Sequence, residues 1–191
     1  GCKDMVAVTL GTGVGGGIIS DGRMITGTAG AGGEIGHIHI EDEEEECCGC
    51  GNKGCLEEYA SATGVVRLAR RRLAKDDAPS MLREGELSAK AVFDAVKAKD
   101  PVAIEVAEQF GNYLGKGLAN ICYVVNPQVV ILGGGVMGQE AILKPKISAA
   151  LKDSLVPSLA DKTQLEFAHH QNTAGMVGAY YHFKQQQARR N

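Results

Sequence analysis

The sequence lacks long apolar runs and any surplus of positive charge. No apolar stretch approaches the roughly 20 residues that a membrane-spanning helix needs, and the first residues do not show the pattern of a secretory signal peptide. Lys and Arg number 20 against 23 Asp and Glu, so the formal net charge is −3. These absences argue against a membrane or a nucleic acid as a partner, and they favour a cytoplasmic location.

Long repeats and low-complexity segments are also missing, apart from one acidic run, Glu41–Glu46. We interpret this run as a solvated loop rather than a cation site. The one basic run, Arg67–Arg72, lies on a helical pattern whose other side carries Val65, Leu68 and Leu73, so we expect a solvated helix face. The 191 residues, 44% of them hydrophobic, are enough for one well-formed core.

Cysteine is sparse outside one short segment, in which four of the six cysteines lie within nine residues. His37 precedes Cys48 with ten residues between them, and Cys50 and Cys55 follow. One imidazole and three thiolates form a closed tetrahedral set for Zn²⁺, which indicates a structural rather than a catalytic ion. The sequence therefore predicts a zinc-binding loop over residues 37–55, with His37, Cys48, Cys50 and Cys55 as ligands.

Two other interpretations of this cluster stay open, namely a disulfide pair and free thiols in a surface loop. Clustered rather than distributed cysteines argue against a disulfide framework. Cys47 could replace Cys48 as a ligand, although the Cys-x-Cys spacing favours Cys48. The Cys-x-Cys arm needs a tight reversal at Gly49, and Gly51 and Gly54 can adopt positive φ at little cost. The glycines therefore support a folded metal loop.

A glycine-rich hairpin is predicted near the start of the chain. Residues 5–10 form a predicted buried strand, residues 11–17 a loop and residues 18–20 a second strand, which returns through an Asp21-Gly22 turn. Because the loop joins strand to strand, it is neither a Walker A loop nor a dinucleotide-binding turn. Glycine amides and a threonine hydroxyl can surround phosphate oxygens, and a flexible turn is the alternative. The candidate phosphate-binding residues are Gly11, Thr12, Gly13, Gly15, Gly16 and Gly17.

Helical spacing dominates the middle of the chain. Helices are predicted over 56–73 with an interruption at 61–64, from Ser88 to Lys97, and from Asp100-Pro101 to Asn126-Pro127. The last of these contains Gly111, Gly115 and Gly117, and a glycine inside a helix costs about 1 kcal/mol relative to alanine. We therefore expect close packing against a neighbouring element to compensate.

A second glycine turn follows a short apolar strand, Val129–Leu132. Ligands of open α/β sheets bind at the carboxyl ends of the strands, so Gly133 and Gly134 are candidates for contact with a base or a sugar. A tight strand-to-helix turn explains them equally well. The remaining predictions are a helix over 143–155, a strand over 164–168 and a terminal helix over 174–187 capped by Asn172. No second metal site is expected from His169 and His170.

Three segments, in the order LGTGVGGGI, GEIGHIHI…CCGCGNKGCLE and NPQVVILGGG, resemble the ROK family of sugar kinases and sugar-responsive repressors. The resemblance covers nearly the whole chain, and the cysteine segment is its most specific part. The continuation EEYASATGVVRLARR is more similar to the bacterial glucokinase branch than to the others. The resemblance implies an α/β fold, namely an actin-like ATPase (ribonuclease H-like) lobe with an inserted zinc-binding loop.

The resemblance also implies roles for individual residues. The glycine hairpin would contact the phosphates of ATP with Mg, and Gly133 and Gly134 the adenosine side. The residues expected to contact sugar hydroxyls are Glu34, His37 and Glu57, and the family's zinc ligands correspond to His37, Cys48, Cys50 and Cys55. One imidazole nitrogen of His37 can bind the metal while the other N–H donates to the sugar.

One departure from the family limits the expected activity. The general base, an aspartate in an Asn-Asp motif, and the first phosphate loop lie further upstream in the family and would precede Gly1. We therefore expect residues 1–191 to be the C-terminal lobe of a two-lobed kinase, with no catalytic residue of its own and no activity when alone. The long acidic insert before the cysteines is a smaller departure.

The implied reaction is ATP-dependent phosphorylation of a hexose, with glucose to glucose 6-phosphate as the leading choice, and the family also implies a homodimer. The alternative is the effector-binding domain of a ROK repressor without its helix-turn-helix. So many bare amides between residues 11 and 17 have little use without phosphate, which favours the kinase.

Overall fold

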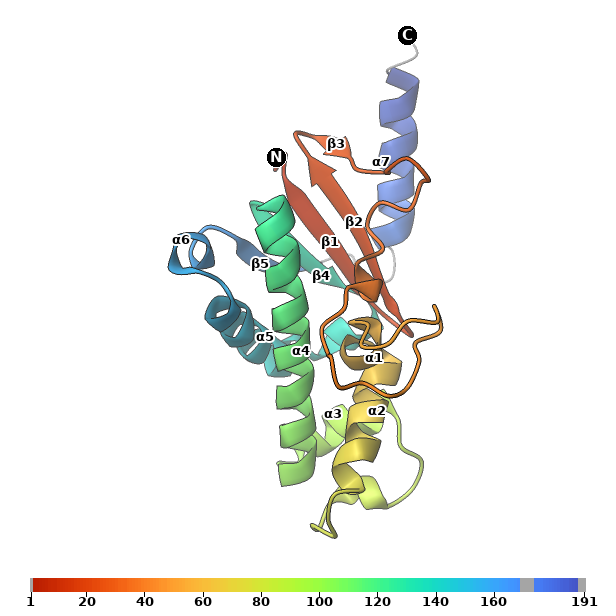
Figure 1. Ribbon diagram of the computed structural model, residues 1–191, viewed down its shortest axis with the longest axis vertical. Helices are drawn as coiled ribbons and strands as arrows, with labels where there is room; N and C mark the ends of the chain where they lie inside the picture. The colour runs from red at the N-terminus through yellow and green to blue at the C-terminus, as the bar shows by residue number, and fades with distance from the viewer. Residues whose placement is uncertain (1, 169–173, 189–191) are drawn as a thin grey trace.

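The computed structural model describes residues 2–168 and 174–188 and contains one five-stranded mixed sheet (Figure 1). The strand order is β3-β2-β1-β4-β5. The strands are β1 (Met5–Leu10), β2 (Val14–Ser20), β3 (Arg23–Met24), β4 (Val129–Gly133) and β5 (Gln164–Phe167). Strand β1 pairs antiparallel with β2 and parallel with β4, and β4 pairs parallel with β5. The predicted α/β fold is confirmed.

Alternation along β1 places its branched side chains in the core. Val6, Val8 and Leu10 are fully buried, as expected for side chains that point to the same face of a strand. Strand β4 is apolar, has buried residues on both faces and lies between β1 and β5, as strands inside an α/β sheet do. At the Asp21-Gly22 turn between β2 and β3 both residues have positive φ, 48° and 70°, as a two-residue hairpin turn requires.

The helices follow the predicted start and stop signals closely. They are α1 (Glu57–Ala60), α2 (Ala62–Leu73), α3 (Ala89–Lys97), α4 (Pro101–Val125), α5 (Glu140–Ser154), α6 (Pro157–Ala160) and α7 (Ala174–Ala188), with 3₁₀ turns η1 (Ile35–His37), η2 (Met81–Arg83) and η3 (Gly135–Gln139). The side chains of Ser88 and Asp100 cap α3 and α4 by accepting backbone hydrogen bonds. Asn126 ends α4 in the left-handed conformation, with φ 48°.

The glycines of α4 lie where other elements approach closely. A Cβ atom on Gly115 would lie 2.5 Å from the Cβ of Ala150 in α5, and one on Gly117 would lie 2.7 Å from the side chain of Leu56. Gly111 is similarly close to Lys146. The expected compensation by close packing is confirmed, because a larger residue at these positions would push the elements apart.

The glycine hairpin differs from the prediction at its second strand. Strand β2 begins at Val14 rather than Ile18, so the connecting loop is Gly11–Gly13 and the later glycines are paired with β1. A Cβ atom on Gly16 would lie 2.5 Å from the backbone oxygen of Gly33. Glycine is tolerated in this strand because another backbone segment crosses it closely.

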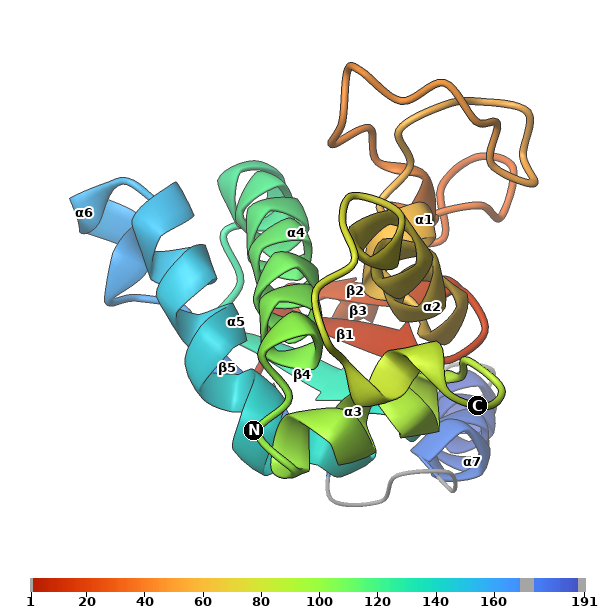
Figure 2. The same cartoon turned by 90° about the horizontal axis from the view of Figure 1, so that it is seen from below.

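Smaller differences occur after the second glycine turn. A 3₁₀ turn, η3, follows β4, so α5 starts at Glu140 rather than residue 143, and α6 was not predicted. Asn172, the predicted cap of α7, lies outside the described residues, as do His169 and His170. Helix α4 lies on one side of the sheet and α7 on the other (Figure 2). No helix among the described residues has the length and apolarity needed to cross a membrane.

Candidate functional site

The hairpin loop Gly11–Gly13 lies against the start of α2. The N–H of Ala62 donates to the oxygen of Gly11 at 2.7 Å, and the hydroxyl of Thr63 donates to the oxygen of Thr12 at 2.7 Å. The positive end of the α2 dipole therefore adjoins the loop that is predicted to hold phosphate. This position suits an anionic ligand electrostatically.

Glu57, the first residue of α1, reaches the same hairpin. Its Oε2 accepts a hydrogen bond from the backbone N–H of Val14 at 2.9 Å, and a Cβ atom on Gly13 would overlap its carboxylate. The Oε1 atom lies 4.0 Å from the sulfur of Cys48. One carboxylate thus touches both the glycine hairpin and the cysteine cluster.

The structure brings together the donor atoms of the four predicted metal ligands. The donors of His37, Cys48, Cys50 and Cys55 all lie within 4.8 Å of one another. The His37 Nδ1 to Cys48 Sγ distance is 3.8 Å, and the Cys50 Sγ to Cys55 Sγ distance is 3.6 Å. A tetrahedron with zinc–sulfur bonds of about 2.3 Å has donor–donor edges of about 3.8 Å. The cluster therefore fits zinc in both composition and spacing.

Of the adjacent residues Cys47 and Cys48, only Cys48 belongs to the group of metal donors. Cys47 is exposed and bridges to Lys53 through the backbone. The 3.6 Å between the sulfurs of Cys50 and Cys55 is also far longer than the disulfide bond of about 2.05 Å. The geometry thus favours the Cys-x-Cys register for a metal.

Protonation of these cysteines depends on burial and on the backbone. Burial raises the pKa of the Cys55 thiol to about 12 and also raises the pKa of Cys48. A hydrogen bond from the backbone of Asn52 lowers the pKa of Cys50. A cation that binds buried thiols must displace their protons, so metal uptake at this cluster would release protons.

Glycines shape the cysteine loop, as predicted. Gly51 has φ 89° and Gly54 φ 69°, and a Cβ atom on Gly54 would overlap the backbone oxygen of Glu41. Gly49 lies in the predicted tight reversal, where the N–H of Gly51 donates to the oxygen of Cys48 at 2.8 Å. The N–H of Cys48 donates to the oxygen of Asn52 at 2.7 Å, which closes the turn.

Of the other two predicted sugar ligands, His37 belongs to the metal cluster and Glu34 lies three residues before it. Glu34 is exposed at the start of η1, and its backbone oxygen accepts a hydrogen bond from the N–H of His37 at 3.2 Å. His37 and Glu57 both adjoin Cys48. Since Nδ1 of His37 faces the sulfur, its Nε2 is the nitrogen left for another partner.

The two predicted nucleotide motifs meet at one end of the sheet. Gly133 pairs with Thr9 at the carboxyl ends of the parallel strands β4 and β1. Gly134 has φ 95°, and a Cβ atom there would overlap the backbone oxygen of Leu10. This edge is where ligands bind in open α/β sheets. The same geometry agrees with the alternative explanation, a tight turn after the strand in which only glycine fits at position 134.

The acidic run is exposed as predicted at Asp42, Glu43, Glu45 and Glu46, but not at Glu44. Glu44 is only 6% exposed and forms ion pairs with Arg67 and Arg71. The prediction was wrong for these residues because opposite charges on two distant segments neutralise each other on folding. Complementary runs of opposite sign, Glu41–Glu46 and Arg67–Arg72, were the sequence signal that could have shown this contact.

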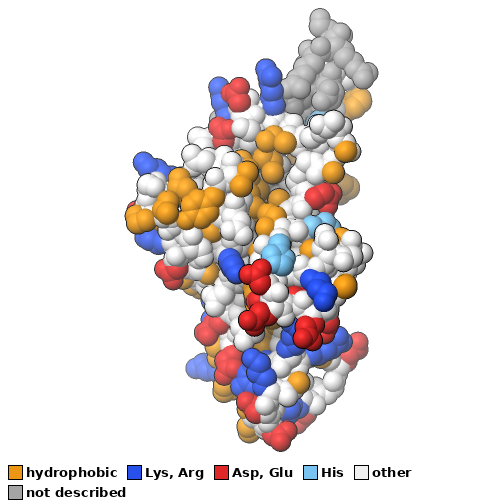
Figure 3. Space-filling model, in the orientation of Figure 1, with side chains coloured by type: hydrophobic (Ala, Val, Ile, Leu, Met, Phe, Trp, Pro, Cys, Tyr) orange, Lys and Arg blue, Asp and Glu red, His pale blue; other side chains and the backbone are white. Residues whose placement is uncertain are grey.

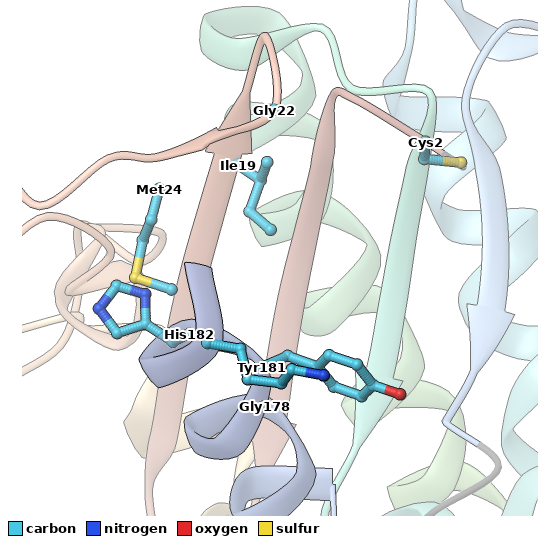
Figure 4. Close-up of a pocket in the computed structure, with 8 residues that line it drawn as sticks. Cys2, Ile19, Gly22, Met24, Gly178, Tyr181 and His182 are labelled. Carbon is cyan, nitrogen blue, oxygen red and sulfur yellow. The ribbon is translucent and has the colours of Figure 1, made fainter. Parts of the chain in front are cut away.

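A cavity of about 660 Å³ lies elsewhere, between α7 and strand β2 (Figure 4). Its lining residues are Cys2, Ile19, Gly22, Met24, Gly178, Tyr181, His182 and Lys184. None of these described residues belongs to the predicted site. The candidate site is instead the surface formed by the hairpin, Glu57 and the cysteine cluster.

The mixed α/β fold of this chain is similar to that of the actin-like sugar kinases of the ROK group. The ROK family matches residues 1–186. The glucokinase of Halalkalibacterium halodurans is 38% identical over 192 residues, covering 98% of this chain and 58% of that protein. The chain belongs to the ROK family.

Two solved structures of the family are also similar. A ROK family glucokinase from Streptomyces griseus, in complex with glucose and AMPPNP, superposes with a TM-score of 0.84 at 32% identity, covering 94% of this chain and 60% of that one. A ROK family transcriptional regulator, a homologue of the E. coli MLC protein, gives a TM-score of 0.74 at 33% identity, with coverages of 86% and 41%. The chain thus spans only part of the length of each of these relatives.

Proposed function

We propose that the chain is the C-terminal lobe of an ATP-dependent hexose kinase and supplies the sugar, zinc and part of the nucleotide site. The observation that carries this proposal is the position of Glu57. Its carboxylate bonds to the N–H of Val14 in the hairpin and lies 4.0 Å from Cys48. A phosphate group at the hairpin and a sugar hydroxyl at Glu57 would therefore be neighbours, as transfer between them requires.

Each part of the site has a distinct task in this proposal. The hairpin, beside the start of α2, holds phosphates of ATP with Mg, and the β4 end with Gly133 and Gly134 adjoins the adenosine. Glu34, His37 and Glu57 hold sugar hydroxyls, because carboxylates and an imidazole N–H form strong, directional hydrogen bonds with them. Phosphoryl transfer depends mainly on such positioning and charge stabilisation.

Zinc has a structural task here. It would be held by His37 through Nδ1 and by the three clustered cysteines, and a closed set of four protein ligands leaves no open position for substrate. Coordination to bound zinc would fix the orientation of the His37 imidazole ring. The Nε2 of His37, on the far side of the ring from Cys48, then donates to the sugar.

The preferred substrate is glucose, on the strength of the relatives. The Halalkalibacterium protein is a glucokinase, and the Streptomyces griseus structure contains glucose and an ATP analogue. The general base is proposed to lie in a preceding lobe, so this chain alone would not turn over substrate. A homodimer is proposed for the intact protein by family resemblance, and light scattering tests it.

The second candidate is the sugar-sensing domain of a ROK repressor, which the similarity to the MLC homologue supports. Such a domain would bind sugar and zinc but not nucleotide. The hairpin favours the kinase, because its loop lies at a helix start suited to phosphate.

Titration calorimetry on this chain separates the two candidates. Glucose and N-acetylmannosamine are titrated first, and AMPPNP with and without Mg²⁺ afterwards. The kinase proposal expects glucose binding that Glu57→Gln weakens and Glu45→Gln, an exposed control, does not. Nucleotide binding by this lobe supports the kinase, whereas sugar binding without nucleotide binding supports the repressor domain.

A coupled assay on the intact polypeptide then tests turnover. We expect phosphorylation of glucose by the intact protein and none by residues 1–191 alone. Kinase-like turnover by the isolated chain would show that the general base lies within it, against the proposal.

A further inference from the structure

The acidic insert between His37 and Cys48 is clamped to the helices through Glu44. The Glu44 carboxylate is almost fully buried, with 1% of its side chain exposed. Arg71 grips both of its oxygens, with N···O distances of 3.0 and 2.8 Å. Arg67 lies 2.8 Å away, and the hydroxyl of Tyr59 donates to the same carboxylate. A buried charge with this many partners fixes one conformation of the insert.

Further contacts hold the insert on either side of Glu44. Glu46 accepts two hydrogen bonds from Arg67, at 3.1 and 2.9 Å. Glu41 accepts one from the hydroxyl of Tyr113 at 2.9 Å, and the ammonium group of Lys116 donates to the backbone oxygen of Ile40 at 2.6 Å. Figure 3 shows acidic and basic side chains interleaved over the lower half of the molecule, where α2 lies.

These contacts bear on the donor geometry because the insert connects two of the donors. A free spacer of ten residues between His37 and Cys48 would let their donor atoms sample many separations. Ordering such a segment costs conformational entropy. Here the folded lobe orders it, and the same network contacts Tyr59, two residues after Glu57.

We propose that Glu44, held by Arg67 and Arg71, is a positioning residue that sets the metal loop in its binding geometry before the metal arrives. The inference rests on the proposed metal site. The insert therefore keeps the loop ordered without metal, and the metal meets donors already within 4.8 Å of one another. Removing the clamp weakens metal binding without removing a ligand.

The first test compares zinc affinities by competition with a chromogenic chelator. Glu44→Gln is expected to bind zinc at least about tenfold more weakly than the parent chain, which is the size of effect that groups supporting metal ligands show. Glu45→Gln, an exposed neighbour, should match the parent chain. Equal affinities of Glu44→Gln and the parent chain would overturn the proposal.

Two further variants separate positioning from general stability. Arg71→Gln removes one arginine and leaves Arg67, so it keeps the proposal testable if Glu44→Gln fails to fold. Glu105→Gln breaks the ion pair between Glu105 of α4 and Arg72, the neighbour of Arg71 on α2, away from the insert. We expect Arg71→Gln to weaken zinc binding and Glu105→Gln to leave it unchanged. If both variants weakened zinc binding equally, the cause would be a general loss of stability, and the proposal would be overturned.

Hydrogen exchange of the metal-free chain gives a readout that needs no zinc. The N–H groups of Cys48 and Gly51 form the turn hydrogen bonds of the loop. Both should be protected in the parent chain and exchange at least about tenfold faster in Glu44→Gln, with strand β1 unchanged. Unprotected loop amides in the parent chain would refute the proposal. Protected amides in a chain that binds no zinc would contradict the metal site instead.

Discussion

The carboxylate of Glu57 accepts a hydrogen bond from the backbone N–H of Val14, with an N···O distance of 2.9 Å. Residues 43 positions apart in sequence thus join the glycine hairpin to the helix that follows the cysteines. Gly13 leaves room for this contact, since a Cβ atom there would overlap the carboxylate. The hairpin and the cysteine segment therefore form one surface.

Substitution of Gly13 should disturb this contact. Gly13→Ala is expected to lower the free energy of unfolding by about 1–3 kcal/mol, because overpacking must displace Glu57. Gly11→Ala is a matched control for stability, since no atom lies within 4 Å of the position of its Cβ. Urea unfolding of the three proteins measures the difference. Equal stability of both variants would contradict the observed contact.

Zinc content should follow the donor group. Elemental analysis of the purified chain is expected to give about one zinc per chain. Cys50→Ser and Cys55→Ser should lose it, because each removes a thiolate ligand. Cys47→Ser should keep it, since Cys47 lies outside the group of donors among the described residues. Loss of zinc from Cys47→Ser alone would instead favour the other register.

The α4–α5 contact should make a helix-favouring substitution destabilising. Gly115→Ala improves helix propensity by about 1 kcal/mol, but its Cβ would lie 2.5 Å from that of Ala150. We expect a net loss of about 1–3 kcal/mol in the free energy of unfolding. Gly178→Ala in α7, with no atom within 4 Å, should be neutral or slightly stabilising. Thermal unfolding of both variants measures the difference. If Gly115→Ala were as stable as Gly178→Ala, the two helices would be free to move apart, against this prediction.

Acid should weaken the clamp on the insert. Burial opposes ionisation of Glu44, but the hydrogen bonds from Arg71 and Tyr59 outweigh it and lower its pKa from 4.5 to about 2. A carboxylate with a lowered pKa stabilises the folded state above pH 4.5, and this contribution is lost as pH falls toward about 2. The shift corresponds to about 3 kcal/mol, at about 1.4 kcal/mol per pKa unit.

The metal-free parent chain and Glu44→Gln test this linkage by urea unfolding. At pH 7 the variant should be less stable by about 3–5 kcal/mol, because it leaves the arginines without their buried partner. The difference should shrink at about pH 3, because the Glu44 carboxyl is then protonated in the unfolded parent chain but still mostly ionised in the folded one, so protons favour unfolding. A difference that stays constant over this range would show that the Glu44 pKa is not lowered.

Local patterns determined much of the fold. The capping side chains of Ser88 and Asp100, the turn at Asp21-Gly22 and the apolar run of β4 were each predictable, because capping, turn chemistry and strand burial act over a few residues. The grouping of His37 with the cysteines was also predicted, since the chemistry of a metal requires its ligands to converge. Family resemblance supplied the site roles that these patterns alone do not give.

Contacts between segments distant in the chain could not be predicted from the sequence. Gly16 has no room for a side chain because the backbone oxygen of Gly33 lies 2.5 Å from the position of its Cβ, and no local propensity encodes that approach. The burial of Glu44 depends on arginines more than twenty residues away along the chain. A charged residue is predicted to be exposed until its partners are known.

By itself, the sequence determined which residues can cap, turn, fill a strand or offer a donor atom, because these properties belong to each residue and its nearest neighbours. Only the tertiary structure decided that Glu57 reaches Val14 and that the acidic insert is clamped at Glu44. Both contacts form when segments distant in sequence pack together, and the free energy of that packing depends on geometry that exists only in the folded chain.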